Sequence, residues 1–505
     1  MTQFSVPWAP KAERGNNGQT WRMLGRILLR LAPLLLIGGV VGTAVGVWAV
    51  NALFAWTSKD LVANSANDSA VTTWFGWPLT LGEIAAAVPG LPRWLALFIW
   101  PLQFPLVRDV ISMTALIVFF TIVPVFAIWW ERKVAGRIQS RLGPMRVGGW
   151  HGWAQSPADG IKLVLKEDLV PKGADRILFR LAPYFAIIPS AAAYMALPFG
   201  VTYIFRDLDV ALVFIVALLG IEVIAVIVGG WASNNKWSTY GAMREACQMV
   251  SYEIPMGMAL LVPVVCVGSL NLRVIGEAQS GGWFTWVAFA NPFAFLAFVS
   301  YFIASLASCK RAPFDLPEAE SELVAGFLTE YSGFRWALFF FAEYAAMFVV
   351  CGLAVILFLG GWNSPLPASW GNVVIERLGD NALSRGLNGV LFSGPIWFIL
   401  KSTFFLYVQI WLRWTLPRIR IDQVLYACVQ VLLPLTMLLL IGVTLWVWAS
   451  TSGSFGWAIF DRVVNVLLGL AGAVFALGLP AFAAYGFYHR RRLVGSLVRD
   501  PLPGS

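Results

Sequence analysis

Long apolar segments joined by short polar links make up most of this chain of 505 residues. Each segment is long enough to cross the hydrocarbon core of a bilayer, which is about 30 Å thick, as one helix. The pattern therefore predicts an all-α polytopic membrane protein with about ten transmembrane helices. They are expected at 31–56, 109–130, 181–200, 209–231, 254–272, 289–309, 334–361, 389–412, 428–449 and 462–486.

The composition supports the same class of protein. Hydrophobic residues form 59% of the chain and charged residues only 12%, with a mean hydropathy of +0.73. The net charge of +9 comes from basic residues in short loops, without the continuous patch that a nucleic-acid face requires. The positive charge therefore indicates contact with anionic lipids and not with nucleic acid.

The distribution of lysine and arginine predicts the orientation in the membrane. With the N-terminus inside, the inner segments carry 27 of the 36 basic residues and the outer segments carry 8, while Lys401 falls within a span. Because positively charged loops stay on the cytoplasmic side, we expect both termini to be cytoplasmic. Lys401 belongs either to a polar axis through the membrane or to an interface that its side chain reaches by snorkelling.

The sequence contains no recognisable redox or nucleotide motif. The five cysteines are scattered without a C-x-x-C pair, and the two histidines, His151 and His489, lack a third ligand for a metal. No Walker-type loop is present, and no G-x-G-x-x-G joins a strand to a helix. We therefore expect no flavin, iron–sulfur cluster, metal or NADH site on this chain, so any redox centre sits on a partner.

A polar segment at 131–180 follows the second predicted span. Near its start, basic side chains recur every four residues at Lys133, Arg137 and Arg141, beside an apolar stripe. This spacing predicts an amphipathic helix that lies on the membrane surface and ends at Gly143. An ordinary positive-inside anchor would explain the basic stripe equally well.

A cluster of four carboxylates lies between two apolar segments, at Asp315, Glu318, Glu320 and Glu322. Carboxylates near a bilayer are costly, and close neighbours resist ionising together. Such a cluster is typical of a site that handles protons, cations or a polar headgroup. The simpler interpretation is that acidic residues favour the first turn of a helix, which would begin near Pro317.

Further acidic residues fall inside or at the ends of the predicted spans. Glu222 lies at mid-span and Glu343 well inside 334–361, whereas four others sit near inner ends of spans: Glu131, Glu245, Glu253 and Glu330. A charged carboxylate at the centre of a membrane helix costs roughly 2.5–3.5 kcal/mol, so each is partnered, protonated or beside water. Together they are candidates for a chain of titratable groups. The alternative for Glu222 is a structural acid bonded to a helix backbone or to a tyrosine.

Three long motifs resemble one family of membrane proteins. They are Glu131 to Pro144, the Gln155…Asp159-Gly160-Ile161-Lys162 segment, and Pro313-Phe314-Asp315-Leu316-Pro317-Glu318-Ala319-Glu320. The family is the H subunit of bacterial NADH-quinone oxidoreductase, called NADH dehydrogenase subunit 1 in mitochondria, which holds the quinone site of respiratory complex I. Two shorter motifs are also similar, namely Tyr331-Ser332-Gly333 and, at the expected start of a helix, Glu253-Ile254-Pro255.

The resemblance divides the chain into three regions. It covers about 109–450 and places eight spans there in the family's order. Residues 1–108 then form an N-terminal extension with one extra helix, and 451–505 form a C-terminal extension with another helix and a basic tail. The cytoplasmic loops of the core would carry short surface helices.

The resemblance also implies a function. The chain would form most of a quinone-binding chamber, for ubiquinone or menaquinone, and the start of a path that couples quinone reduction to proton translocation. It would lie in a bacterial inner membrane, and its partners would be peripheral iron–sulfur and quinone-site subunits, small membrane subunits, antiporter-like subunits and lipids. The chamber and its entrance would involve Arg137, Arg141, Asp159, Lys162, Phe314, Asp315, Glu318, Glu320 and Glu322. The proton relay would involve Glu131, Glu222, Glu245, Glu253, Glu330 and Glu343.

Three other functions compete with this interpretation. The equivalent subunit of an energy-converting hydrogenase would share the fold without a deep quinone chamber, although the intact loop motifs favour the quinone version. A stand-alone ion transporter would use the buried acids directly, but the chain shows no internal inverted repeat. A membrane scaffold with inert acids predicts that no carboxylate substitution affects turnover in assembled membranes.

Overall fold

The computed structural model describes residues 105–201, 203–318, 320–365 and 394–451, with four further positions between 464 and 470. Within these ranges every regular element is a helix, which confirms the all-α class. The spans predicted at 31–56 and 462–486 lie wholly or almost wholly outside the described residues, as do the two terminal extensions.

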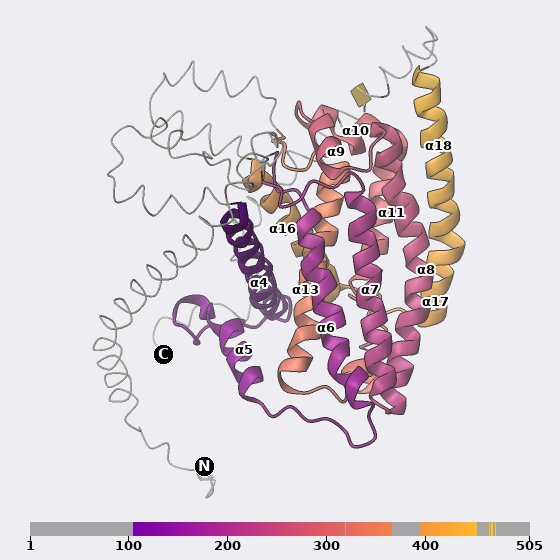
Figure 1. The fold of residues 1–505 in the computed structure, drawn as a ribbon. Helices are drawn as coiled ribbons and strands as arrows, with labels where there is room; N and C mark the ends of the chain where they lie inside the picture. The colour runs from indigo at the N-terminus through magenta and orange to yellow at the C-terminus, as the bar shows by residue number, and fades with distance from the viewer. Residues whose placement is uncertain are drawn as a thin grey trace, which may run out of the picture. The chain divides into compact units, whose positions relative to one another are not determined.

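Each of the eight spans predicted between 109 and 449 is matched by a helix (Figure 1). Among the described residues, seven helices are long and apolar enough to cross a membrane, and the eighth, α11 (Pro292–Ser308), has 17 residues. The first six are α4 (Pro105–Ile138), α6 (Arg176–Ala193), α7 (Ala211–Ala232), α8 (Lys236–Val267), α13 (Gly333–Phe358) and α16 (Gly394–Thr415). The seventh joins α17 (Ile421–Leu425), a π-helical segment (Tyr426–Leu432) and α18 (Leu433–Thr451). The chain is therefore a multi-pass membrane protein.

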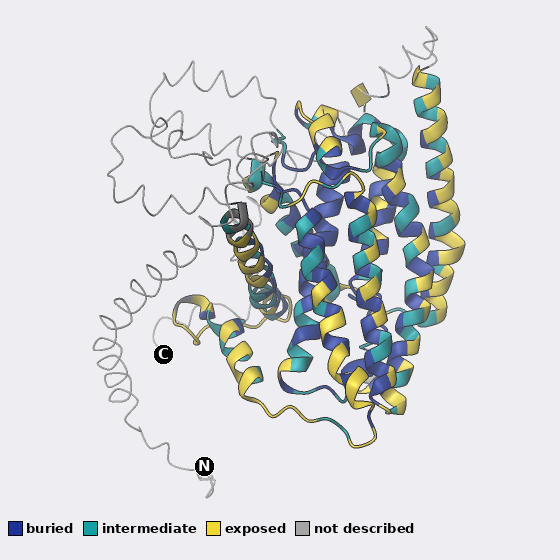
Figure 2. Ribbon diagram, in the orientation of Figure 1, coloured by how far each residue is buried: buried dark blue, intermediate teal, exposed yellow. Residues whose placement is uncertain are grey.

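Helix α13 lies at the centre of the described helices. In its most apolar window 89% of the residues are buried, against 44% or less in each of the other six. It contacts α6, α16, α4 and α11, which surround it. Figure 2 shows buried positions on the facing sides of the helices and exposed positions on their outer sides. Side chains of α13 therefore meet protein on nearly every side.

Consecutive helices run in opposite directions, so their links gather at two ends. One end, termed the loop end, holds the links 139–175, 233–235, 309–332 and 416–420. Its short elements are η2 (Trp150–Gly152), α5 (Gln155–Leu165), α12 (Glu320–Leu323) and η5 (Gly326–Leu328). The opposite end holds η3 (Tyr194–Ala196), α9 (Leu272–Ala278), η4 (Trp283–Thr285) and α10 (Val287–Ala290). In Figure 1 the loop end lies at the bottom, beside α5.

The surface helix predicted at 131–142 is wrong. These residues begin as the last turns of α4, which continues without a break to Ile138. Beyond it Ser140 adopts a left-handed conformation (φ 55°), and Gly143 packs so closely on the backbone of Arg132 that a side chain would meet its carbonyl. The chain therefore doubles back on α4. The short α5, with most of its residues exposed, is the helix that lies at the surface.

The start predicted for the span at 254–272 is also wrong. Helix α8 begins at Lys236, where the side chain of Asn235 caps the first turn, and passes through Pro255. Glu253 therefore lies in the middle of a helix and not at its start. Hydropathy misses the added turns because they carry polar residues that are buried against other helices, namely Ser238, Glu245, Gln248 and Ser251.

Candidate functional site

A cavity of about 820 Å³, termed the large cavity, lies between α4, α5, α6, α13 and the end of α16. Most of its walls are apolar or aromatic, as in sites that bind hydrophobic ligands. The apolar walls include Ile117, Phe120, Val125, Ile128, Leu163, Ile187, Phe334, Phe340, Phe341 and Trp414. The charged lining residues are Glu131, Arg132, Arg141, Asp159 and Arg413. The cavity thus joins a long apolar surface to a few charged groups.

Asp159 of α5 is held at the wall of the large cavity by three neighbours. Arg132 forms an ion pair with its carboxylate, and Gln155 donates a hydrogen bond from Nε2 at 3.2 Å. The ammonium group of Lys162, one turn along α5, lies 3.8 Å from Oδ1, the oxygen that accepts from Gln155. Arg141 lines the same cavity and donates to the side chain of Gln139. Charges of both signs therefore lie where α5 meets the end of α4.

Glu131 is the most buried charged group on the large cavity, with 5% of its surface exposed. Arg413 donates from Nη1 to its carboxylate at 2.6 Å, and the hydroxyl of Tyr344 donates to the other oxygen. Nη1 of Arg311 lies 3.7 Å from the carboxylate. Three segments, α16, α13 and the loop after α11, therefore converge on one residue of α4.

A second cavity of about 430 Å³ adjoins the large one. Four residues line both cavities, namely Trp336, Phe340, Arg413 and Trp414. They form a wall that the two cavities share. Because the second cavity also contains carboxylates of the 309–332 link, it is termed the acidic cavity.

The carboxylates of the acidic cavity have different surroundings. Asp315 pairs with Arg418, whose Nη2 lies 3.0 Å from Oδ2. Glu318 is desolvated, and this burial, followed by the charges of Glu343 and Asp315, raises its pKa well above the usual range. The Glu318 carboxyl therefore favours its neutral form, in which it is able to donate a proton.

Two consecutive cations, Lys310 and Arg311, extend from this link into the membrane-spanning helices. Nε of Arg311 lies 3.1 Å from Oε1 of Glu343, and its guanidinium lies over the ring of Tyr344 at 4.3 Å. Nζ of Lys310 lies 3.3 Å from Glu222. Both cations are almost fully buried. Two adjacent residues of one link thus serve two different groups of carboxylates.

The charge of these cations is maintained by their neighbours. Burial alone would lower the pKa of each, but nearby carboxylates outweigh burial and raise the pKa of both Lys310 and Arg311. For Lys310 the strongest of these are Glu245 and Glu222, and for Arg311 it is Glu343. Both side chains therefore remain cationic at neutral pH.

Comparison with known proteins identifies the family. The model of the NADH dehydrogenase family matches residues 111–444, which is more than half of the chain. The H subunit of the NADH-quinone oxidoreductase of Chlorobaculum parvum is 45% identical over 346 residues, which cover 68% of this chain and 93% of that protein. The chain belongs to the H-subunit family of NADH-quinone oxidoreductase.

Other relatives agree with this assignment. The H subunit of the enzyme of Geobacillus thermodenitrificans is 47% identical over 312 residues, covering 62% of this chain and 86% of the relative. An H subunit of Rhizobium meliloti is 43% identical over 339 residues, which cover 65% of this chain and 94% of that protein. Like other members of the H-subunit family, this chain is a membrane subunit of a multi-subunit NADH-quinone oxidoreductase.

The structure separates the predicted chamber residues of this subunit into several groups. Arg141 and Asp159 line the large cavity, whereas Asp315 and Glu318 line the acidic cavity. Phe314 is buried in the core beneath the link and lines neither. Two other residues, Arg137 at the end of α4 and Lys162 on α5, are exposed beside the large cavity.

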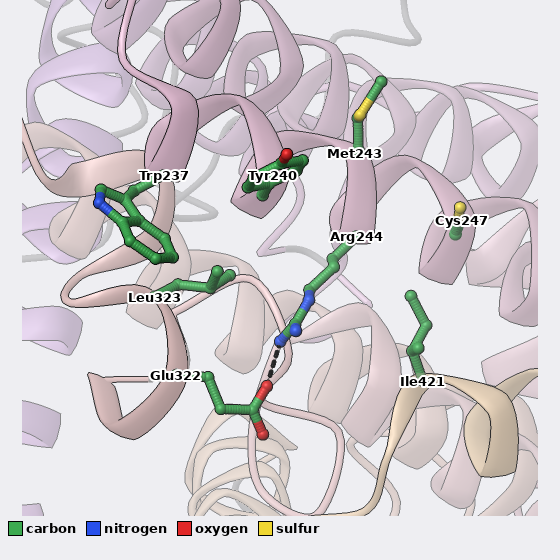
Figure 3. Close-up of a pocket in the computed structure, with 8 residues that line it drawn as sticks. All are labelled: Trp237, Tyr240, Met243, Arg244, Cys247, Glu322, Leu323 and Ile421. Carbon is green, nitrogen blue, oxygen red and sulfur yellow. Dashed lines mark hydrogen bonds and ion pairs between the residues drawn. The ribbon is translucent and has the colours of Figure 1, made fainter.

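Glu322 lies away from both cavities, in a third pocket that shares no lining residue with them (Figure 3). Its carboxylate pairs with Nη1 of Arg244 at 2.5 Å, beneath the side chains that α8 presents at its first turns. The helix expected near Pro317 begins at Glu320 and has four residues. The side chain of Glu320 lies outside the described part of the chain.

The predicted relay residues are partly brought together. Glu131, Glu222, Glu245 and Glu343 are all buried around Lys310 and Arg311. The other two, Glu253 and Glu330, lie apart from this cluster: Glu253 is partly buried beside α7, and Glu330 accepts a hydrogen bond from the side chain of Asn235 at 2.5 Å. Glu222 bonds to neither a helix backbone nor a tyrosine in the described structure; Ser190 donates to it at 3.0 Å.

The ammonium group of Lys401, on α16, lies at the loop that follows α13. Its ammonium group donates to three backbone carbonyls beyond the end of α13, those of Leu359, Gly361 and Asn363, at 2.7 to 3.1 Å. It also lies over the ring of Trp286 at 4.2 Å. Lys401 therefore satisfies backbone carbonyls of the loop that follows α13.

Sequence reasoning missed the cations and the tyrosine that organise the site, namely Lys310, Arg311, Tyr344, Arg413 and Arg418. The basic residues contributed only to the charge balance that predicts orientation. The adjacent Lys310-Arg311 pair at the start of the acidic motif was the available signal, because buried acids require counter-charges. Within the described residues, no group of three or more His, Cys, Asp or Glu side chains is arranged to hold a metal.

Proposed function

We propose that the large cavity binds a quinone and that the acidic cavity begins the path of protons coupled to its reduction. The observation that carries this proposal is the shared wall, in which Arg413 lies between an apolar cavity and a cluster of carboxylates. The apolar lining suits an isoprenoid tail, and arginine and tyrosine donors suit the headgroup oxygens. Reduction to the quinol consumes protons, for which carboxyl groups beyond the wall are suitable donors.

The proposed proton path runs from the acidic cavity into the membrane-spanning helices. Glu318 and Asp315 form its first part, and Glu343 follows, beside Arg311. The last part is the pair of glutamates around Lys310. The distances between these charged groups support a path that a few bridging waters would complete. Its continuation belongs to neighbouring membrane subunits.

The setting of this subunit follows from the same proposal. The loop end faces the cytoplasm of a bacterium, and the iron–sulfur and quinone-site subunits cover it. Small membrane subunits, antiporter-like subunits and lipids surround the helices. Ubiquinone or menaquinone is the substrate, and the flavin and iron–sulfur clusters are on the partner subunits.

Filling the large cavity tests the proposal. Ala337, on α13, lines the cavity, so Ala337→Trp places an indole ring where the quinone is proposed to lie. We expect the assembled complex to lose most of its NADH:quinone reductase activity. Electron transfer from NADH to ferricyanide, which accepts electrons before the quinone, should stay at the wild-type level in the same membranes.

Val118→Trp provides the matched control, because Val118 is 50% exposed on the outer side of α4. This variant should reduce quinone normally. If Ala337→Trp assembles and also reduces quinone at the normal rate, the large cavity is not the quinone site.

A further inference from the structure

A deeply buried group of charges lies around Lys310. Its Nζ lies 3.3 Å from Oε1 of Glu222 on α7 and 3.8 Å from Oε1 of Glu245 on α8. Lys310 is 4% exposed, Glu222 is 6% exposed, and Glu245 is fully buried. One ammonium group therefore lies between two carboxyl groups from two helices.

The charges of this group do not balance unless one carboxyl is protonated. Lys310 is the one cation found within ion-pair distance of either glutamate in the described residues, because Arg311 turns towards Glu131 and Glu343. Two carboxylates that share one ammonium in a buried site would leave a net negative charge, which is costly in a low-dielectric environment. The three side chains therefore hold one exchangeable proton.

The two carboxyl groups differ in how they are satisfied. Glu222 has the closer ammonium group, at 3.3 Å, and its other oxygen lies 3.0 Å from the hydroxyl of Ser190, which also reaches the carbonyl of Ala186 at 3.0 Å. Neither oxygen of Glu245 has a hydrogen-bond partner among the described residues. Because Glu222 is better stabilised as an anion, the arrangement corresponds to a proton on Glu245 and an ionic Lys310–Glu222 pair.

We propose that Lys310, Glu222 and Glu245 form a one-proton switch in which the ammonium group and the proton exchange places. When Lys310 moves towards Glu245, the O–H bond on Glu245 breaks and an O–H bond forms on Glu222, so the net charge of the group stays unchanged. The two Nζ–O distances are 3.3 Å and 3.8 Å, so the proposed exchange requires only a small movement of the ammonium group. The inference rests on the proposed proton path and names its residues.

The backbone links the switch to the cavities. Lys310 precedes Arg311, which contacts the Glu131 carboxylate that lines the large cavity. The charged groups that face Lys310 come from every neighbouring element: Glu222 of α7, Glu245 of α8, Glu343 of α13 and Glu318 of its own link. If reduction of a bound quinone shifts the 309–332 link, the ammonium group of Lys310 therefore moves relative to all four carboxyl groups.

Two single substitutions test the switch in the intact complex. Glu222→Gln and Glu245→Gln each leave one carboxylate beside Lys310, so the remaining ion pair is locked and holds no exchangeable proton. We expect both variants to assemble, to keep electron transfer to ferricyanide, and to show a several-fold lower ratio of protons translocated to quinone reduced in proteoliposomes. Redox-induced infrared difference spectra should also lose the band of a protonated carboxyl group.

A charge-compensated variant separates loss of the switch from loss of folding. Lys310→Met combined with Glu222→Gln leaves a neutral Glu245, so it should assemble and still fail to restore proton translocation. Lys236→Met, at the exposed start of α8, is the control for a lost lysine and should translocate protons normally.

Normal proton translocation in both glutamate variants would overturn the switch. Failure of the quinone site itself is distinguished by Ala337→Trp, because that variant would then reduce quinone normally whatever the result for the switch.

Discussion

Arg413 links the two cavities at the level of a single side chain. It lines both of them and donates to Glu131, a nearly buried carboxylate, at 2.6 Å. Charge-assisted hydrogen bonds of this kind are stronger than neutral ones. Without the Arg413 guanidinium, the Glu131 carboxylate would keep only the hydrogen bond from Tyr344 and the ion pair with Arg311, whose Nη1 lies 3.7 Å away. The shape and charge of the shared wall therefore depend on this arginine.

Arg413→Gln should weaken quinone turnover without removing the complex from the membrane. A hydrogen bond to a charged group is worth about 1.5–3 kcal/mol, so we expect a raised KM for quinone together with a lower kcat. Quinone titrations of membranes, normalised to ferricyanide reduction, measure both.

The quinone turnover of Arg413→Lys should lie between that of Arg413→Gln and that of the wild type, because lysine keeps the positive charge but lacks the planar guanidinium group. Arg146→Gln, at an exposed position of the same end, is the control and should show wild-type kinetics. Unchanged kinetics in Arg413→Gln would remove Arg413 from the site.

At the scale of elements, α8 supports the link that carries the cations. It packs on α7, α11 and α18 and also contacts η5, within the 309–332 link. Gly241 makes the contact possible, because a Cβ there would meet the backbone nitrogen of Phe327 at 2.7 Å. The backbone of the link cannot move aside for a Cβ as easily as the end of a flexible side chain can. The position of Lys310 and Arg311 therefore depends indirectly on a glycine in another helix.

Gly241→Ala should loosen the link and destabilise the protein by about 1–3 kcal/mol, the usual cost of overpacking. Gly257→Ala is a matched control on the same helix, since a Cβ at Gly257 would meet nothing within 4 Å. Heating the purified complex in steps and measuring the fraction that stays intact compares the two. Equal dissociation temperatures for both variants would contradict the role assigned to Gly241.

Sequence patterns predicted the spans well where apolar residues face lipid or other helices. They failed at α8 because inward-facing polar residues such as Glu245 and Gln248 lower the hydropathy of buried turns. They failed at 131–142 because helical periodicity does not show where a helix ends relative to the membrane. The ion pairs could not be predicted from sequence for another reason. Lys310 and Glu222 are 88 residues apart, and their contact depends on how α7, α8 and α11 pack.

At the scale of the whole molecule, large apolar surfaces remain on the outer helices. On α18, for example, Leu438, Ile441 and Trp448 are each more than half exposed. Such surfaces are stable in lipid or against other membrane helices. This agrees with a chain that works as one subunit of a larger membrane complex.

Mild extraction of native membranes, followed by a native gel and mass spectrometry, tests the identity of that complex. We expect the chain to comigrate with flavin and iron–sulfur NADH-dehydrogenase subunits and with antiporter-like membrane chains. A nickel–iron hydrogenase subunit in the same band would instead favour the hydrogenase-type complex, and migration alone would favour a transporter. The same gel after dissociation with a strong detergent controls for chance comigration.

The central position of α13 has a consequence for biogenesis. Its neighbours α4, α6 and α11 are synthesised before it, but α16 is synthesised after it. The large cavity needs the same late helix, because Arg413 and Trp414 close part of its wall. The walls of the large cavity are therefore complete only once α16 has been inserted beside α13.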